Sequence, residues 1–555
     1  MPKGSLSIRE QADLILRVPA AERLKLLLDA PRPMALVRAL PDGDFYLTVR
    51  EVGPHDALPI LALASAPQIT HLLDLESWRG DRFDPLRAGA WVALFAETDE
   101  ATLRRFVRNA DDEALALLIR DWARIKPLEI DHEEPTKGHG ITETGDERGS
   151  ISPDGAYMLS PERTEHALPV RRFMEMLFHD DEARYRGLVR AALYELPSEI
   201  EESSLKWRTA RLEEHGYPPF EDALGAYAPP EKNPAPAPDP PEPETAEGLT
   251  ATRSALLLLG PKDLIVAAAM KIPDSERERV LFGLGALANR ILIADREDPG
   301  SPESHRRVIE RVGSYVGLAL DNRKATDATS AANTLVDIPT LELFREGYAK
   351  AQALAERARR LSSKVTDFID SPLKQRIAAL TGPRPLYIET KDDGETRARD
   401  FRRTTEIEET SLTLDLIAAL TTLLIDHRDT TPKALLAEER HPFEDVPRFS
   451  TLLLTALAWH ATRGEIKIDR LPADVVADFL RTTASRRTAP ADAPARAMGK
   501  LTDALAREGS LDRRTAAALA AFGVSCLDRL AADCASLEPG TPVTPRVVGC
   551  LRLAL

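Results

Sequence analysis

The chain has 555 residues, of which 43% are hydrophobic and 29% are charged, and its formal net charge is −16. This length exceeds what one hydrophobic core normally serves, so we expect two or more domains. The acidic balance excludes nucleic acid or an anionic membrane surface as the main partner, because both require a basic face. Only 5% of the residues are aromatic, which favours helices over sheets.

The cysteines, the first residues and the apolar runs of the chain indicate its cellular compartment. The cysteines, Cys526, Cys534 and Cys550, lie close to the C-terminal end and form no disulfide framework. The first residues lack the apolar core of a signal peptide. The apolar run 255–270 is interrupted by glycine and proline and is too short to cross a bilayer. We therefore expect a cytoplasmic protein without membrane insertion.

The first lobe, residues 1–228, is predicted to be a series of short helices. Apolar residues recur at i, i+3 and i+4 in 103–107, and at i, i+3, i+4 and i+7 in 115–122, so each set shares one helical face. Acidic and capping residues precede both segments, where the helix dipole favours them. Because no short helix can bury its apolar stripe alone, consecutive helices are expected to stack into an array.

The segment 73–81 is the first candidate binding site. It places Trp78 and Arg79 between Asp74 and Asp81. Tryptophan and arginine are the anchor types enriched at interface hot spots, which favours a recognition corner. The alternative is structural: an arginine–carboxylate pair ties the loop across a helix end while Trp78 packs inward.

A second candidate site lies at the end of the first lobe, in Trp207, Arg208 and Arg211. Trp207 and Arg211 are four residues apart, so on a helix the guanidinium can stack on the indole or reach acidic residues upstream. Such pairs are common in purely structural contexts, and this alternative stays open.

Other polar segments of the first lobe carry weaker signals. The segment 130–148 combines histidines and carboxylates, which are metal-ligand types, but without a fixed spacing; we interpret it as a solvated acidic loop. The segment 152–159 reads as a turn that leads into a short strand.

Residues 229–248 form a proline-rich acidic linker. Eight prolines remove backbone donors, and almost no apolar side chain is present, so neither a helix nor a central strand can form. We expect a semi-rigid extended spacer between the two lobes.

The second lobe, residues 249–555, is predicted to be larger and helical, with minor β structure and a sub-boundary near 382–400. A single short strand is expected at 386–390. Helices are expected near 276–296, 302–321, 340–362, 405–426, 447–463, 471–483, 495–507 and 511–535.

Catalytic signatures are weak in this lobe. Gly283, Gly285 and Ala288 match a dinucleotide fingerprint, but the preceding residues read as helix, so we interpret them as small residues at a close helix contact. His427 and His460 are interpreted as capping and packing residues, although with His441 they leave an acid–base or metal site open. We predict no catalytic residues, no metal ligands and no cofactor.

The chain resembles a bacterial family of about this length that is known only as a domain of unknown function. The resemblance rests on short motifs along most of the chain, which are Leu73 to Asp81, Leu196-Pro197-Ser198-Glu199, Trp207 to Leu212, Gly216-Tyr217-Pro218, Phe344 to Tyr348 and Thr404 to Glu408. It implies no activity. The serial short helices are also faintly similar to the cytosolic helical domain of bacterial magnesium transporters, and this similarity rests on helix rhythm alone.

These observations favour a mostly α-helical, cytoplasmic scaffold that binds another protein through its acidic helical surfaces. One alternative is a regulatory protein that responds to a divalent cation, with Mg²⁺ as the expected ion. The other is an enzyme whose dispersed active site requires a deep pocket where carboxylates or histidines converge.

Overall fold

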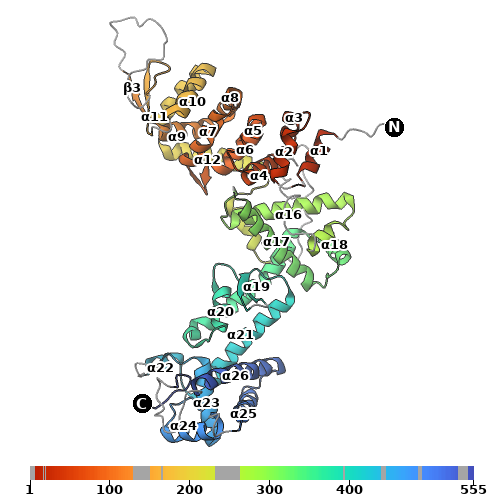
Figure 1. Ribbon diagram of the computed structural model, residues 1–555, viewed down its shortest axis with the longest axis vertical. Helices are drawn as coiled ribbons and strands as arrows, with labels where there is room; N and C mark the ends of the chain where they lie inside the picture. Colours follow the sequence, from red (N-terminus) through yellow and green to blue (C-terminus); the bar gives the residue numbers. More distant parts are fainter. Residues whose placement is uncertain are drawn as a thin grey trace. The chain divides into compact units, whose positions relative to one another are not determined.

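The computed structural model of the protein describes residues 7–16, 18, 20–128, 150–163, 167–231, 263–299, 301–391, 394–438, 445–484, 490–534 and 548–554 (Figure 1). Contacts divide the chain into two compact units, Met1–Arg345 and Glu346–Leu555. The described residues are mostly α-helical, which confirms the predicted fold class, and their β structure is limited to small two-stranded sheets.

The first part of the Met1–Arg345 unit is a succession of short helices. Neighbouring and next-but-one helices pack against one another, as expected for elements that cannot bury their apolar stripes alone. The helices are α1 (Ile8–Ile15), α2 (Ala20–Leu28), α3 (Pro33–Arg38), α4 (Asp42–Val52), α5 (Leu58–Leu63), α6 (Ala66–Glu76), α7 (Pro85–Glu97), α8 (Glu100–Asn109), α9 (Asp112–Trp122), α10 (Ala167–Asp180), α11 (Glu182–Tyr194) and α12 (Pro197–Glu214).

Local sequence explains where several of these helices begin. The hydroxyl of Ser65 accepts the N–H of Gln68, whose side chain accepts the N–H of Ser65 in return, and this capping box starts α6. Asp99 accepts the N–H of Thr102 at the start of α8. The apolar residues predicted to share one face of α8 and of α9 are all buried, so the predicted helix faces are confirmed.

A chain of aromatic rings forms part of the core of this array. The ring centroids of Phe95 and Phe106 lie 5.6 Å apart, those of Phe106 and Phe173 lie 6.1 Å apart, and Trp122 meets Phe173 edge to face at 6.3 Å. Gly89 on α7 lies against this group, and a Cβ atom at this position would come within 2.4 Å of Nε1 of Trp122. A glycine therefore permits the close approach of α7 and α9.

The β structure of this unit consists of two antiparallel pairs. Strand β1 (Trp78–Arg79) pairs with β2 (Arg82–Phe83), and β3 (Ala123–Pro127) pairs with β4 (Tyr157–Pro161). The strand expected after the turn at 152–155 is confirmed as β4. Strands β1, β2 and β3 were not predicted, because runs this short carry too little period-2 alternation to be recognised.

The remainder of the Met1–Arg345 unit contains longer helices. Within the described residues these elements are α13 (Phe220–Leu224), η2 (Gly225–Tyr227), α15 (Leu264–Ala269), α16 (Asp274–Ala294), α17 (Pro302–Asn322), α18 (Ala328–Asp337) and the beginning of α19 (Thr340–Val365). Helix α13 packs against α16, and the hydroxyl of Tyr227 donates to Asp295 at 2.8 Å.

The division into units differs in position from the predicted linker. Most of the stretch 229–248 lies outside the described residues, and segments on both sides of it belong to the Met1–Arg345 unit. The N–H of Glu231 donates to Glu342 at 2.8 Å, which ties the start of the stretch to α19. Whether 1–228 and 249–555 fold as separate domains stays a prediction.

The Glu346–Leu555 unit is also helical. The helices expected in this unit are present, with bounds that agree to within a few residues, whereas the helices Leu373–Thr381 and Pro432–Ala437 were not predicted. The strand expected at 386–390 is β5 (Tyr387–Thr390), which pairs with β6 (Thr396–Arg399). The elements are η4 (Thr366–Phe368), α20 (Leu373–Thr381), α21 (Thr404–Leu424), η5 (Asp426–Arg428), α22 (Pro432–Ala437), α23 (Phe449–Arg463), α24 (Ala473–Phe479), a π-helical turn η6 (Leu480–Ala484), α25 (Ala493–Glu508) and α26 (Arg513–Cys534).

Two helical segments of this unit, Thr404–Arg428 and Arg513–Asp533, are long and apolar enough to cross a membrane by length and composition alone. Helices α21 and α26 pack against each other and α23 packs against both, so these segments also fit the core of a helical domain. Cys526 on α26 is buried, and burial raises the pKa of its thiol to about 12, as expected for a small buried hydrophobe.

Candidate functional site

The two predicted sites meet at one place in the Met1–Arg345 unit. Helix α6 ends at Glu76, and the chain then turns back through the β1–β2 hairpin, in which Trp78 pairs with Phe83. Gly80 adopts a positive φ of 62° at the turn, a conformation that glycine permits without strain. Helix α12 packs against both α6 and β2, and the N–H of Phe83 donates to Glu201 at 2.8 Å.

Trp78 is enclosed in this arrangement, with 5% of its surface exposed. Its indole meets the ring of Phe83 edge to face at 5.5 Å, and the guanidinium of Arg208 lies 5.3 Å from the ring centroid. Nε of Arg208 also donates to the carbonyl of Asp74 at 2.7 Å. Burial lowers the pKa of Arg208 to about 10, and the group still carries its charge at neutral pH.

Arg211 joins three helices. Its Nε and Nη2 atoms donate to the carboxylate of Asp74 on α6 at 2.8 and 2.7 Å, and Nη1 and Nη2 donate to Asp111 at 2.9 and 2.7 Å, immediately before α9. Asp74 is 6% exposed, and burial raises the pKa of its carboxyl while the bonds from Arg211 oppose the increase. We call Asp74, Trp78, Asp111, Arg208 and Arg211 the arginine clamp.

The other predicted residues are displayed at the surface. Arg79 pairs with Asp84 at 2.6 Å, its side chain is 72% exposed, and Asp84 caps the first turn of α7. Asp81 is exposed at the hairpin turn. Trp207 is 54% exposed on α12, although the next residue is anchored in the clamp. The structure therefore unites Asp74, Trp78, Arg208 and Arg211, and separates them from Arg79, Asp81 and Trp207.

Sequence reasoning did not assign Asp111 and Glu201 to this site. Asp111 was interpreted only as the start of a helix, and 100 residues separate it from Arg211. A contact across such a separation leaves no local periodicity. The sequence offered one indirect signal: an arginine on a buried helical face requires an acidic partner, so an acidic residue had to be expected opposite Arg211.

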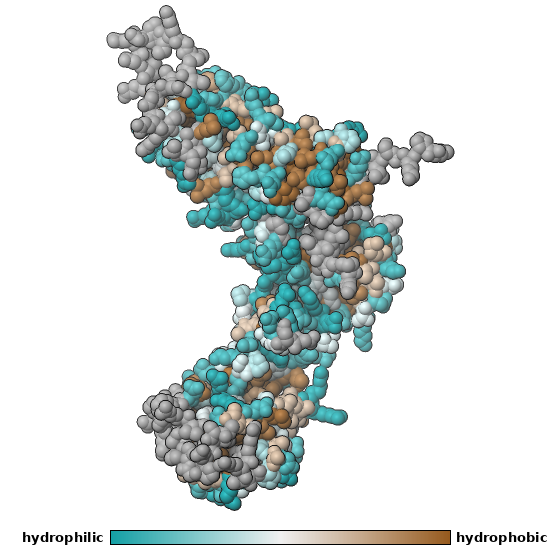
Figure 2. Space-filling model, in the orientation of Figure 1, coloured by the Kyte–Doolittle hydropathy of each residue, from teal (hydrophilic) through white to brown (hydrophobic). Residues whose placement is uncertain are grey.

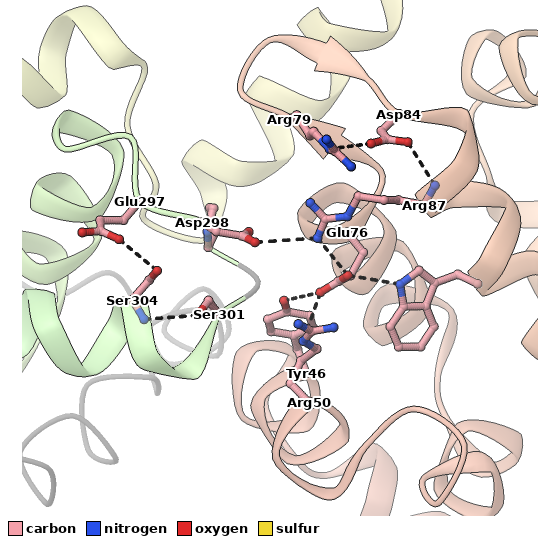
Figure 3. A network of polar contacts seen from close by, with 12 residues as sticks. Tyr46, Arg50, Glu76, Arg79, Asp84, Arg87, Glu297, Asp298, Ser301 and Ser304 are labelled. Carbon is pink, nitrogen blue, oxygen red and sulfur yellow. Dashed lines mark hydrogen bonds and ion pairs between the residues drawn. The ribbon is translucent and has the colours of Figure 1, made fainter.

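A second polar network surrounds the buried carboxylate of Glu76 (Figure 3), which lies two residues after Asp74 of the clamp. The hydroxyl of Tyr46 donates to Oε1 at 2.6 Å, and Nε of Arg50 lies 3.3 Å from the same oxygen. Arg87 and the indole N–H of Trp91 donate to Oε2 at 3.2 and 3.3 Å. Burial and the carboxylate of Glu76 raise the pKa of Tyr46 well above its usual range, so its hydroxyl remains a donor.

Arg87 links this network to the loop after α16, because its guanidinium also lies 3.8 Å from Asp298. Every charge around Glu76 is therefore partnered. Such a network stabilises the packing of α4, α6 and α7.

A pair of imidazoles is buried beside the same helices. His71 is 2% exposed, its ring centroid lies 4.2 Å from that of His215, and neither of its ring nitrogens has a hydrogen-bond partner in the described part of the chain. Tyr46 and Tyr217 flank His71 at 6.3 and 6.4 Å. Burial lowers the pKa of His71 well below its ordinary value, and His215 and His305 lower it further. His71 is therefore neutral at physiological pH.

The described residues of this unit also surround a pocket of about 570 Å³. Its walls come from the end of α12, the segment 216–222, the middle of α16 and the start of α19. Gly283 lines the pocket as part of helix α16, and a Cβ there would meet the hydroxyl of Thr340 at 3.0 Å. This close contact agrees with our interpretation of the Gly283 motif as helix packing.

The predicted metal and acid–base candidates do not form a centre in the described residues. The loop 130–148 and His441 lie outside them, His427 pairs with Glu508 at 3.1 Å, and His460 lies in the last turn of α23. Within the described ranges, no group of three or more histidine, cysteine, aspartate or glutamate side chains is placed to hold a metal ion.

The fold and these contacts define a mostly α-helical protein whose first unit contains a buried arginine clamp and a pocket of about 570 Å³. Comparison with known proteins adds the family. The chain belongs to a family of unknown function, DUF6178, whose model matches residues 2–554, which confirms the whole-chain resemblance. No curated protein and no solved structure matches the chain, and the fainter similarity to magnesium-transporter domains receives no support.

Proposed function

We propose that this protein is a cytoplasmic helical scaffold that binds another protein through the surface at the α11–α12 corner. The observation that supports this is the exposure of large apolar side chains there: Tyr194 is 67% exposed, Leu196 59% and Trp207 54%. Tyrosine and tryptophan are enriched at interface hot spots. Large apolar side chains that gather at the surface mark sites of interaction with other proteins.

The clamp holds this surface in place. Trp207 follows Leu196 by eleven residues, about three helical turns, so both lie on one side of α12. Arg208 and Arg211 anchor the same helix to α6 and α9. An indole on an anchored helix loses little conformational entropy on binding, which favours affinity.

A second apolar surface is present on the first helices. Leu14 on α1, Leu26 on α2 and Met34 on α3 are each between 41% and 47% exposed. Figure 2 shows apolar residues gathered over this part of the array. Helices at the end of a stacked series lack a neighbour on one side, so such a surface is equally consistent with a scaffold that contacts more than one partner.

Site-specific photo-crosslinking tests the proposal. A benzophenone amino acid replaces Trp207 in one variant and Val524, which is 58% exposed in the other unit, in the control. Irradiation in native extract, followed by mass spectrometry, is expected to give a defined protein adduct from position 207 only. That adduct should diminish when unlabelled wild-type chain competes and persist when the unlabelled Trp207→Ala variant competes. The same adducts from both positions, or none, would contradict the proposal.

The cation-responsive alternative makes a separate prediction, because carboxylate-rich helix edges screened by Mg²⁺ should allow the chain to compact. Small-angle scattering with and without physiological magnesium measures this change, and an unchanged profile counts against the alternative. For the enzyme alternative, the pocket lined by α16 is the place where convergent groups would have to act.

A further inference from the structure

The pocket lined by α16 has the size and composition of a small-molecule site. Its volume of about 570 Å³ falls within the range of roughly 300 to 1,000 Å³ that is typical of ligand pockets. One face of α16 supplies Phe282, Gly283, Ala286 and Leu287, which recur at helical spacing and give an apolar surface. Pro218, Pro219, Pro339 and Leu341 extend this apolar lining.

Two arginines, Arg290 and Arg345, lie in the pocket lining. Of these two, only Arg345 has hydrogen-bonded or ion-paired partners among the described residues. Arg345 donates to the carbonyl of Gly225 at 2.7 Å and to Glu231 at 3.1 Å, and it also pairs with Glu342 at 2.5 Å. These bonds fasten the segment after α13 to α19. The guanidinium of Arg345 is therefore a structural group with its donors engaged.

Arg290 differs from Arg345. It is half-buried at the end of the apolar face of α16, and it has no hydrogen-bonded or ion-paired partner among the described residues. Burial lowers its pKa, the positive charge of Arg345 lowers it further, and Asp222 acts in the opposite direction. A half-buried guanidinium with unused donors next to a second cation is well placed to bind a carboxylate.

Carboxylates at the rim determine what else the ligand must carry. Glu213 and Asp222 line the pocket and are exposed. Glu231 is also exposed but pairs with Arg345 at 3.1 Å, and the buried Glu342 is engaged by Arg345 and by the N–H of Glu231. With four acids and two arginines, the ionisable lining is net negative. A simple anion would be repelled by this surface, whereas a ligand that also carries a cationic group would satisfy the exposed acids.

We propose that this pocket binds a zwitterion with an apolar body, that is, a hydrophobic amino acid or a short hydrophobic peptide. Its carboxylate pairs with Arg290, its ammonium group faces the acids of the rim, and its side chain lies on the apolar face of α16. The inference is independent of the protein-binding proposal, because the pocket and the α11–α12 corner use different residues.

Isothermal titration calorimetry on the full chain tests the inference with defined probes. L-leucine and leucyl-leucine carry both charges, isocaproate lacks the ammonium group, and isoamylamine lacks the carboxylate. We expect saturable binding of leucine, of the dipeptide or of both, and at least about tenfold weaker binding of the two singly charged analogues. The tighter of the two zwitterions identifies whether the natural ligand is a free amino acid or a peptide.

Matched variants connect the binding to the pocket. Arg290→Gln removes the charge that receives the carboxylate, and Ala286→Phe fills the apolar surface without changing a charge. Both are expected to weaken binding at least about tenfold while circular dichroism shows unchanged helix content. Arg306→Gln alters an exposed arginine of α17 outside the pocket lining and should bind as the wild type does.

Two results would overturn the inference. One is the absence of both heat and thermal stabilisation with either zwitterion at millimolar concentration. The other is equal binding by the wild type and by the folded Ala286→Phe variant, which would place the ligand elsewhere even if Arg290→Gln failed to fold.

Discussion

The guanidinium of Arg211 holds the carboxylate of Asp74 through bonds of 2.7 and 2.8 Å, although 137 residues separate them in the chain. The same guanidinium holds Asp111, so a single side chain joins α12 to α6 and to the start of α9. The stability of the array should therefore depend on this residue more than on any exposed ion pair nearby.

Replacement of Arg211 by methionine is expected to destabilise the protein by about 3 kcal/mol, because it leaves the buried Asp74 carboxylate without a partner. Urea denaturation followed by circular dichroism measures the change. The matched control is Arg79→Met, which removes a 72% exposed side chain from its ion pair with Asp84 and should cost less than about 1 kcal/mol. Equal losses in the two variants would show that the clamp does not stabilise the array. The double variant Asp74→Asn/Arg211→Met should recover part of the lost stability, since the uncompensated charge is gone.

Trp78 and Trp207, one from each of the two predicted sites, should behave in opposite ways. Trp78→Ala removes a side chain that is 5% exposed and is expected to cost about 3 to 5 kcal/mol, whereas Trp207→Ala should change stability by less than about 0.5 kcal/mol. Acrylamide quenching reports the same difference: Trp207→Ala should remove a strongly quenched part of the tryptophan fluorescence, and Trp78→Ala should retain that part. A large stability loss for Trp207→Ala would mean that its side chain packs in solution and is not available to a partner.

Gly89→Ala tests the close approach of α7 and α9. A Cβ at this position would lie 2.4 Å from Nε1 of Trp122, so the indole or the helix must shift, at a cost of about 1 to 3 kcal/mol. Gly187→Ala on α11 is the control, because a Cβ there meets no atom within 4 Å and alanine favours the helix. Thermal melts of the two variants should therefore move in opposite directions. If Gly89→Ala were as stable as the wild type, the Trp122 indole would be able to shift without lowering the free energy of unfolding.

The buried imidazole of His71 predicts a dependence of stability on pH. Its pKa is lowered by burial in the folded state, so below pH 6.5 the unfolded chain binds more protons than the folded chain. The free energy of unfolding should be highest above pH 6.5 and should decrease as the pH falls below that value. His71→Leu should reduce this dependence, while His55→Leu, at an exposed position, should leave it unchanged. The measurement is urea denaturation between pH 5 and pH 8, and an identical slope in the wild type and His71→Leu would contradict the assignment.

Many helices of this protein, and the buried faces of α8 and α9, followed from the sequence by itself. Capping residues and i, i+3, i+4 spacing act within one or two turns, so the faces of α8 and α9 and the bounds of α16 and α17 could be predicted locally. The choice of Asp74 and Trp78 in one candidate site and of Arg208 and Arg211 in another also rested on residue type, and tertiary packing brings these four residues together. Whether these side chains are buried or exposed could not be predicted, because a buried tryptophan and an exposed one can occur in the same local sequence pattern.

Only the tertiary structure decided which charges meet and which stay unpaired. Asp111 became a partner of Arg211 because α9 and α12 pack together, and Arg345 became saturated because the segment after α13 folds back onto α19. Arg290, which lines the same pocket as Arg345, has no hydrogen-bonded or ion-paired partner among the described residues. The energy of an ion pair depends on the distance between the two charges and on how far each is removed from water. Both quantities are set by the packing of different helices, so residue spacing along the chain does not predict them.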